Sequence, residues 1–218
     1  MAAGPAAQAS PVAGRAAVPA AGLAEAAAEL ARQLLAGDPE RVAHSAAVAR
    51  RAQSLARTVP AEQREPLVAA AWLHDIGYAD ALHQTGFHPV DGARYLRRQG
   101  WSRLVAELVA HHSGARFVAV VRSLEAHLEE FPFDEGPASD LLTVADQTVG
   151  PGGRPMPVEE RMVDVLRRHG PESPNGRAAA RRNPYLLAAA RRVADRLERL
   201  GVAPEEHRIL AARVQRTG

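Results

Sequence analysis

The feature that most limits the fold of this chain is its succession of helix-forming stretches. Residues 23–36, "LAEAAAELARQLLA", and residues 158–170, "VEERMVDVLRRHG", are typical: both are rich in good helix formers, and short segments with Gly and Pro separate such stretches. Strand-like and helix-like segments do not alternate along the chain. The sequence also has no Gly-rich phosphate loop and no internal repeat. The sequence therefore predicts an all-α fold, a compact bundle of many helices.

Local signals predict where the helices that carry polar residues begin and end. Asp38 followed by Pro39 is typical of a helix start, and the helix that follows contains His44. The next helix is expected over about Leu67–Ile76, with Gly77 ending it. The stretch "RFVAVVRSLEAHLEE" is compatible with a helix, although "FVAVV" alone would also suit a strand.

Composition divides the chain into three parts. Residues 1–22 are rich in Ala and Pro and are expected to form a disordered tail; residues 23–150 are expected to form the core. Residues 151–218 are expected to be a helical extension packed on that core, and they hold 14 Arg against 8 acidic residues. This local excess of charge could dock an acidic partner or nucleic acid, but a solvated helix face is the preferred interpretation. The whole-chain charge of +2 gives nucleic acid no further support.

The residue types that are missing exclude several kinds of chemistry. The chain has no Cys, which excludes disulfides, thiolate catalysis and zinc–thiolate sites. All 27 basic residues are Arg, which excludes lysine Schiff bases and the lysine of a P-loop. There is no run of 18 apolar residues, so we expect a cytoplasmic protein that does not span a membrane. Any metal would have to be bound by His and carboxylate side chains.

Histidines and aspartates recur at helix positions that are expected to face the interior. Each would cost several kcal/mol if it were buried without a partner. A divalent metal removes that cost by accepting lone pairs from neutral imidazoles and ionised carboxylates, and Fe, Mn, Co, Ni or Mg suit such ligands. The residues at these positions are His44, His74, Asp75, His88, His111, His112 and Asp146.

Five of the segments that carry these residues resemble a known family. They are "RVAHSAAVA", "LHDIG", "FHPVDGARYL", "VAHHSG" and "LLTVADQ". Their order and spacing resemble the HD-domain superfamily of metal-dependent phosphohydrolases, over about residues 38–150. The third and fourth segments are similar to those of the branch that binds two metals. The resemblance implies an HD-domain helical bundle, with extra helices after it in this chain.

The resemblance also implies a ligand set. His44, His74, Asp75 and Asp146 would bind the first metal, and Asp75 would bridge to a second. His88 would bind the second metal together with His112, His111 or both, with His112 favoured because a small hydroxyl residue follows it.

It further implies catalytic roles. His74 and Asp75 would act at the reacting atoms, where a metal-bound water attacks phosphorus. If His112 is the ligand, His111 would be free to contact substrate phosphate. Arg116 is a candidate phosphate clamp and Arg94 a weaker one.

The departures from the family pattern limit what can be said of the substrate. The Gly-Tyr-Pro motif of the cyclic di-GMP phosphodiesterase branch is missing after "HHSG", and Tyr78 stands where many relatives carry Lys. The layout is closest to the branch that hydrolyses dinucleoside tetraphosphates. We therefore expect a small phosphorylated substrate, a nucleotide or a related phosphoester or phosphoanhydride. Two alternatives remain: a mixed-valent di-iron oxygenase on the same scaffold, and a non-catalytic sensor or binding module.

Overall fold

The computed structural model describes residues 22–202, and within that range the chain folds into α-helices joined by short turns. No β-strand occurs among the described residues, so the all-α prediction is confirmed. The expected tail lies outside this range except for Gly22. The segment "PEEHRILAARV", which the sequence predicts as a last helix, also lies outside it. The helices are α1 (Leu23–Leu34), α2 (Pro39–Leu55), α3 (Ala61–Leu73), α4 (His88–Arg98), α5 (Arg103–His111), α6 (Ala115–Arg122), α7 (Glu125–Leu128), α8 (Pro137–Gln147), α9 (Val158–His169) and α10 (Pro174–Arg199).

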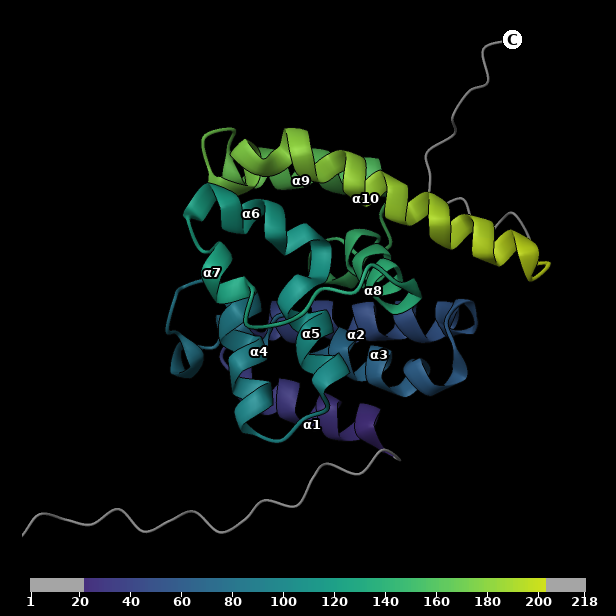
Figure 1. Ribbon diagram of the computed structural model, residues 1–218, viewed down its shortest axis with the longest axis horizontal. Helices are drawn as coiled ribbons and strands as arrows, with labels where there is room; N and C mark the ends of the chain where they lie inside the picture. The colour runs from purple at the N-terminus through teal and green to yellow at the C-terminus, as the bar shows by residue number, and fades with distance from the viewer. Residues whose placement is uncertain (1–21, 203–218) are drawn as a thin grey trace, which may run out of the picture.

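The first half of the chain forms the lower layer in Figure 1, where α1 lies against α3, and α3 against α2 and α5. Alanines allow this close approach: Ala27 and Ala31 of α1 and residues 69–71 of α3 are fully buried. Larger aliphatic side chains such as Leu67 and Leu73 fill the space between the helices. The core is thus mainly aliphatic, as the low aromatic content suggests.

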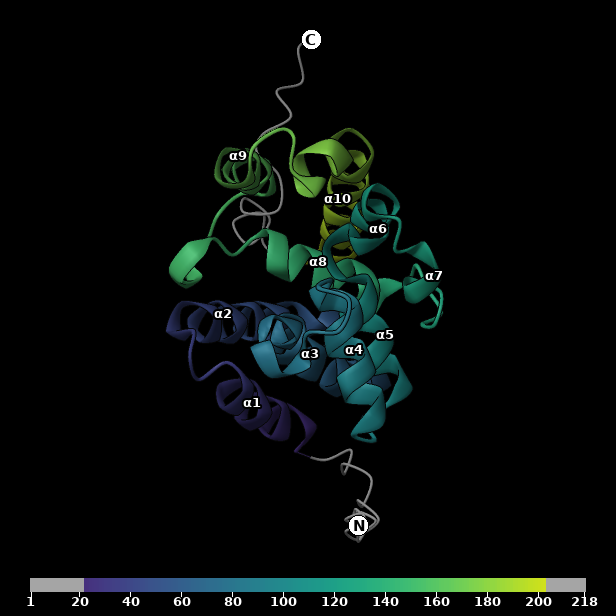
Figure 2. The same ribbon diagram turned by 90° about the vertical axis from the view of Figure 1, so that its left-hand side faces the viewer.

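The second half of the chain covers the other side. Helix α8 lies centrally, with contacts to α2 and α3 on one side and to α9 and α10 on the other. Figure 2 shows α9 above α2, and α10 beside α6 and above α8. Helices α9 and α10 both contact α8, the helix that carries Asp146. The division into domains at residue 150 stays a prediction.

Several helix boundaries differ from those that the sequence predicts. Asp38 caps α2 as expected, since its Oδ1 accepts a hydrogen bond from the backbone N–H of Arg41 at 3.0 Å. Helix α3, however, begins at Ala61 and ends at Leu73, with Pro66 inside it. The proline removes one backbone hydrogen bond of this helix without ending it. Most of residues 116–130 are helical, in α6 and α7, so "FVAVV" forms a helix and not a strand.

The start of α10 also differs from what the sequence predicts. Gly, Pro, Ser and Asn in "GPESPNG" predict a loop over residues 170–176, but α10 begins within this segment, at Pro174. Ser173 is the N-cap: its Oγ accepts a hydrogen bond from the backbone N–H of Gly176 at 3.0 Å. A Ser-Pro pair at a helix start combines a capping side chain with a preset φ angle.

One described stretch, Arg103–Arg122, is long and apolar enough to cross a membrane by length and composition alone. It includes α5 and α6, and 61% of its most apolar window is buried inside the molecule. The backbone changes direction within it, because Ser113 and Gly114 both have positive φ angles, of 53° and 70°. Such burial is typical of a core helix in a soluble protein.

Candidate metal centre

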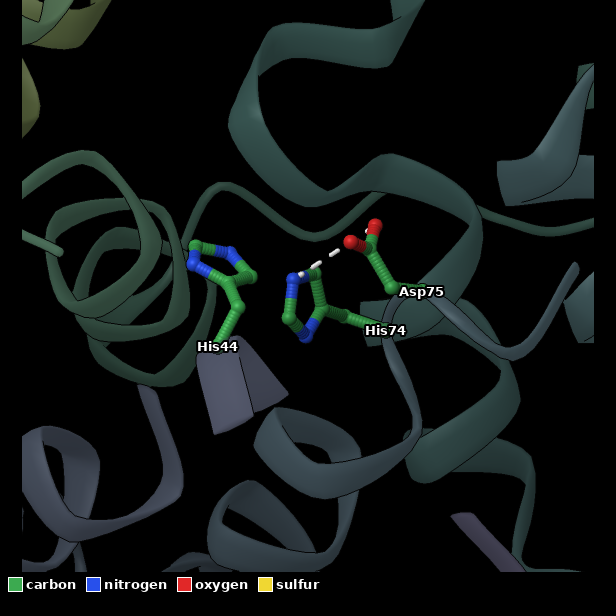
Figure 3. A group of neighbouring side chains, drawn as sticks. All are labelled: His44, His74 and Asp75. Carbon is green, nitrogen blue, oxygen red and sulfur yellow. Dashed lines mark ion pairs between the residues drawn. The ribbon is translucent and has the colours of Figure 1, made fainter. Parts of the chain in front are cut away.

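Three polar side chains from two distant segments point toward one another (Figure 3). His44 lies in the second turn of α2, and His74 and Asp75 lie in the turn directly after α3. A nitrogen or oxygen from each of the three lies within 4.8 Å of the others, and all three residues are buried. Helix α8 brings Asp146 to the same place, since its Oδ1 lies 3.0 Å from His44 Nε2 and 3.8 Å from His74 Nε2.

A second group adjoins the first and shares Asp75 with it. Asp75 Oδ1 lies 3.5 Å from His74 Nε2 and 3.5 Å from His88 Nε2, so it faces both groups. His112 completes the second group, because its Nε2 lies 3.3 Å from His88 Nε2 and 3.9 Å from Asp75 Oδ1. The structure thus brings together six of the seven predicted ligands.

Backbone carbonyls orient two of the imidazoles. His74 Nδ1 donates to the carbonyl oxygen of Ala71 at 2.9 Å, and His112 Nδ1 donates to that of Val109 at 2.7 Å. With the proton on Nδ1, the lone pair of each Nε2 points into the centre, as in metal-binding histidines. His74 Nε2 is buried and has no hydrogen-bond partner. A divalent cation would satisfy this atom, so the residues present fit a metal site.

Asp146 and Asp75 each use one carboxylate oxygen, Oδ2, to accept hydrogen bonds from neighbouring side chains. Asp146 Oδ2 accepts hydrogen bonds from Ser113 Oγ and from Gln147 Nε2, the latter at 3.0 Å. Asp75 Oδ2 accepts a hydrogen bond from Arg41 Nη1 at 2.7 Å. In both cases the other oxygen, Oδ1, is left facing the imidazoles. Neighbouring residues therefore fix the orientation of each candidate ligand.

The charges within the centre are strongly coupled. Burial would raise the pKa of Asp75, but the nearby His74, His88 and His44 lower it below its ordinary value. Burial lowers the pKa of His88 well below its ordinary value, despite the opposing charge of Asp75. Burial, followed by the charge of His74, likewise lowers the pKa of His112. At neutral pH the second group therefore offers ionised carboxylate and neutral imidazole, the forms that bind metals.

Gly77 allows the two groups to come together. A Cβ atom at this position would lie 2.0 Å from the backbone oxygen of His88 and 2.8 Å from the backbone nitrogen of Gly92. Only a glycine lets the start of α4 approach the turn after α3 so closely. Gly77 was expected to end a helix, but it lies in the short turn Ile76–Tyr78, and its role is close packing.

His111 is the predicted ligand that does not join the group. Its Nε2 donates to the backbone oxygen of Phe131 at 2.7 Å, and its ring packs on Phe133 with centroids 4.9 Å apart. Helix α5 ends at this residue, and the backbone turns through His112 and the positive-φ Ser113. The adjacent histidines therefore face different parts of the molecule, and a ligand or phosphate-binding role for His111 is not supported.

The two arginines proposed as phosphate clamps also lie elsewhere. The guanidinium of Arg116 lies 4.4 Å from the ring centroid of Phe133 and 4.6 Å from that of Tyr185, on the side of His111. Arg94 forms an ion pair with Glu130 and donates to His127 Nδ1. Neither arginine lines the cavity over the candidate metal centre. Aromatic and carboxylate neighbours that the sequence does not place nearby hold them away from it.

A cavity of about 420 Å³ opens over both ligand groups. Its lining includes five arginines but only two acidic residues, Asp75 and Asp146. Tyr78 also lines it, stacked on His88 with ring centroids 3.9 Å apart. Sequence reasoning missed all five arginines as cavity residues, although one of them lies three residues before His44, on the same face of α2. The five are Arg41, Arg122, Arg161, Arg168 and Arg182.

A family model for the HD domain matches residues 41–200 of the chain, which is more than half of its length. The chain belongs to the HD domain family. No curated protein and no solved structure shows a significant match to it. The HD domain match extends beyond residue 150 and includes α9 and α10. HD domains bind divalent metals and are in general metal-dependent hydrolases, which agrees with the His and Asp groups described above.

Proposed function

We propose that this HD domain protein is a metal-dependent phosphohydrolase that cleaves a nucleotide or a related phosphoester or phosphoanhydride. The observation that carries the proposal is the position of Asp75, shared by two imidazole groups at the base of an arginine-lined cavity. Membership of the HD domain family supports hydrolysis. The excess of arginine over acid in the cavity favours an anionic substrate.

We further propose that the centre binds two divalent cations, of Fe, Mn, Co, Ni or Mg. His44, His74, Asp75 and Asp146 would hold one, and Asp75, His88 and His112 the other. Such cations supply Lewis acidity and lower the pKa of bound water toward neutrality. The absence of Cys from the chain fits these harder ions.

The protein's own groups orient and balance this chemistry. The carbonyl oxygens of Ala71 and Val109 hold the imidazoles of His74 and His112 in the tautomer whose Nε2 faces the centre. Arg41 keeps one oxygen of Asp75 occupied, and its guanidinium lies 3.7 Å from the ring centroid of Tyr78. Arginines around the cavity would bind phosphoryl oxygens and stabilise the negative charge that develops on them.

Tyr78 takes the place that Lys occupies in many relatives. Burial, and after it the charge of Asp75, raises the pKa of the phenol above its ordinary value. The phenol thus stays protonated at neutral pH and can donate a hydrogen bond. A role for Tyr78 as hydrogen-bond donor to the substrate agrees with its position in the cavity lining.

An anaerobic phosphatase assay tests the proposed function. Full-length protein is stripped with a chelator, reloaded separately with Mn²⁺, Co²⁺, Ni²⁺, Mg²⁺ or Fe²⁺, and incubated with nucleotides and nitrophenyl phosphates. Phosphate release without oxygen that depends on added metal, and that Asp75→Asn abolishes, is the expected result. Turnover that strictly requires oxygen would instead identify an oxygenase. No turnover and no bound metal would favour a non-catalytic binding module.

A further inference from the structure

The upper wall of the cavity contains a buried cation that forms no ion pair within the described part of the chain. Arg182 of α10 is only 7% exposed, and it lines the cavity over the candidate metal centre. Its Nη1 donates to Asn175 Oδ1 at 2.7 Å, while its Nε is buried without a hydrogen-bond partner. No carboxylate among residues 22–202 forms an ion pair with it. Burying a guanidinium in this way is unfavourable unless an anion binds beside it.

The position of Arg182 is fixed from two sides. A Cβ atom on Gly114 would lie 2.9 Å from Cγ of Arg182, so the aliphatic part of this side chain packs directly on the glycine. Gly114 has a φ angle of 70° and follows the candidate ligand His112 by two residues. Asn175 fixes the other end of the side chain, at the guanidinium. Arg182 therefore lies between Gly114 and Asn175, close to the segment that carries the candidate ligand His112.

Helix α9 adds further positive charge to the same wall. Arg161 and Arg168, two helical turns apart, both line the cavity. They share a single carboxylate, Asp164, whose oxygens also accept a hydrogen bond from Arg167. One carboxylate cannot balance three guanidiniums. Arg161 Nε is also buried without a hydrogen-bond partner.

The guanidinium of Arg182 on α10 lies near the positive charges of α9. Burial lowers the pKa of the Arg182 guanidinium, and the charge of Arg161 lowers it further, against the opposing influence of Asp146. Two cations placed together in a buried wall repel each other when no anion is present. This wall faces the same cavity as the metal ligands but is built from α9 and α10, which carry none of those ligands.

We propose that Arg182, with Arg161 and Arg168 beside it, binds a second phosphoryl group of the substrate, distinct from the group that reacts at the metal centre. This proposal rests on the proposed function, and it narrows the class of substrate. The substrate class is then a compound with at least two phosphoryl groups, such as a phosphoanhydride or a nucleoside diphosphate, rather than a simple monoester. Guanidinium groups suit this role because each can donate two parallel hydrogen bonds to a phosphoryl group.

A matched pair of ligands that cannot be hydrolysed tests the proposal by binding alone. Methylenediphosphonate carries two phosphoryl-like groups and methylphosphonate carries one. Calorimetric titration of the full chain, both loaded with Mn²⁺ and after chelation, is expected to show tighter binding of the diphosphonate in both states. Arg182→Met keeps the aliphatic stem but removes the charge, and it is expected to weaken diphosphonate binding about tenfold or more. Its effect on methylphosphonate is expected to stay within about threefold.

Arg191→Met is the control, because Arg191 is exposed on the same helix. It is expected to leave both affinities unchanged. A purely structural role for Arg182 makes a different prediction: Arg182→Met would lower the melting temperature and leave diphosphonate binding intact. Removal of an unpaired buried charge should instead leave the melting temperature unchanged or raise it.

Two outcomes would overturn the proposal. One is equal affinity for the two phosphonates in the wild-type protein, and the other is unchanged diphosphonate affinity in Arg182→Met. Where substrates turn over, Arg182→Met is expected to raise KM for diphosphates about tenfold and to raise KM for monoesters much less. Tight diphosphonate binding without turnover of any phosphate compound would contradict the proposed hydrolysis. It would still support an anion-binding site at Arg182.

Discussion

Arg41 holds one oxygen of Asp75, with Nη1 lying 2.7 Å from Oδ2, while the other oxygen faces the imidazoles of both ligand groups. The carboxylate that joins the two groups is thus oriented from outside by a cation. The same guanidinium lies over the ring of Tyr78 and contacts Asp38, so it is fixed by three neighbours. Arg41 therefore contributes both orientation of Asp75 and positive charge beside the cavity.

Replacing Arg41 should separate metal binding from turnover. Arg41→Gln removes a positive charge next to Asp75, so we expect the protein to bind metal at least as well as the wild type. We expect kcat to fall by about tenfold to a hundredfold, because a preorganised donor to developing negative charge is lost. Metal analysis and steady-state kinetics on the same preparation test this. Loss of metal in Arg41→Gln would show that Arg41 acts only by orienting Asp75.

The shared position of Asp75 predicts a graded series of metal contents. Wild-type protein should bind two ions per chain, and His88→Ala about one, since this substitution disrupts only the second group. Asp75→Ala should bind the least, because both groups lose a ligand. Inductively coupled plasma mass spectrometry after dialysis against each metal gives the stoichiometry. A wild-type value of one ion per chain, unaltered in His88→Ala, would rule out the dinuclear centre.

The adjacent histidines 111 and 112 should behave in opposite ways. His112→Leu is expected to reduce metal content, because Nε2 of His112 faces the second group. His111→Leu should keep its metal but destabilise the fold by about 1–3 kcal/mol, because the carbonyl of Phe131 loses its hydrogen-bond donor. Metal analysis and urea unfolding of both variants test the pair. Metal loss in His111→Leu together with retention in His112→Leu would reverse the assignment.

Gly77→Ala should disrupt the contact between the turn after α3 and the start of α4. The new Cβ would lie 2.0 Å from the backbone oxygen of His88, so the backbone must move. We expect a loss of about 3 kcal/mol or more in the free energy of unfolding. Gly37→Ala is the control, because no atom lies within 4 Å of the added Cβ. It should be neutral or slightly stabilising. Similar stability of both variants would contradict the tight approach at Gly77.

Glu130 should make a small, pH-dependent contribution to stability. Hydrogen bonds from Arg94, followed by those from Arg97, lower the pKa of this carboxyl from 4.5 to about 2. A pKa that is lower in the folded state gives stability that is present above about pH 4.5 and lost as the pH falls toward 2. Because Glu130 is partly exposed, solvent screening limits the effect to about 1 kcal/mol.

Urea unfolding of the wild type and Glu130→Gln at pH 7 and pH 3 measures this contribution. The variant is expected to be less stable than the wild type at pH 7, and the difference in stability is expected to be smaller at pH 3. A stability difference that does not shrink between these two pH values would show that packing, not charge, accounts for the role of Glu130.

The sequence predicts six side chains that the structure brings together, but it does not predict the cavity around them. Residues such as His44, His74 and Asp146 are uncommon on apolar helix faces, so their positions carry a strong signal. Arginine carries little signal in a chain with 27 of them, and the position of Arg182 depends on how α10 packs. Arg41 could have been found, since it lies one turn before His44.

The choice between His111 and His112 shows a different limit. In a continuous helix, adjacent residues point about 100° apart, and the sequence does not say which one faces the centre. The outcome depends on where α5 ends and on the positive φ angle of Ser113, an unusual conformation for a non-glycine residue. Local backbone conformation of this kind follows from tertiary packing rather than from residue preference.

The hydrogen bond between His44 and Asp146 joins residues that are 102 positions apart. During synthesis, the first histidine emerges from the ribosome long before the aspartate that completes its environment. A nascent chain that ends before α8 therefore lacks Asp146, so its candidate metal centre is incomplete, and α9 and α10 emerge later still. Maturation of the centre is thereby a late event in the life of each polypeptide, after most of the helical scaffold has been made.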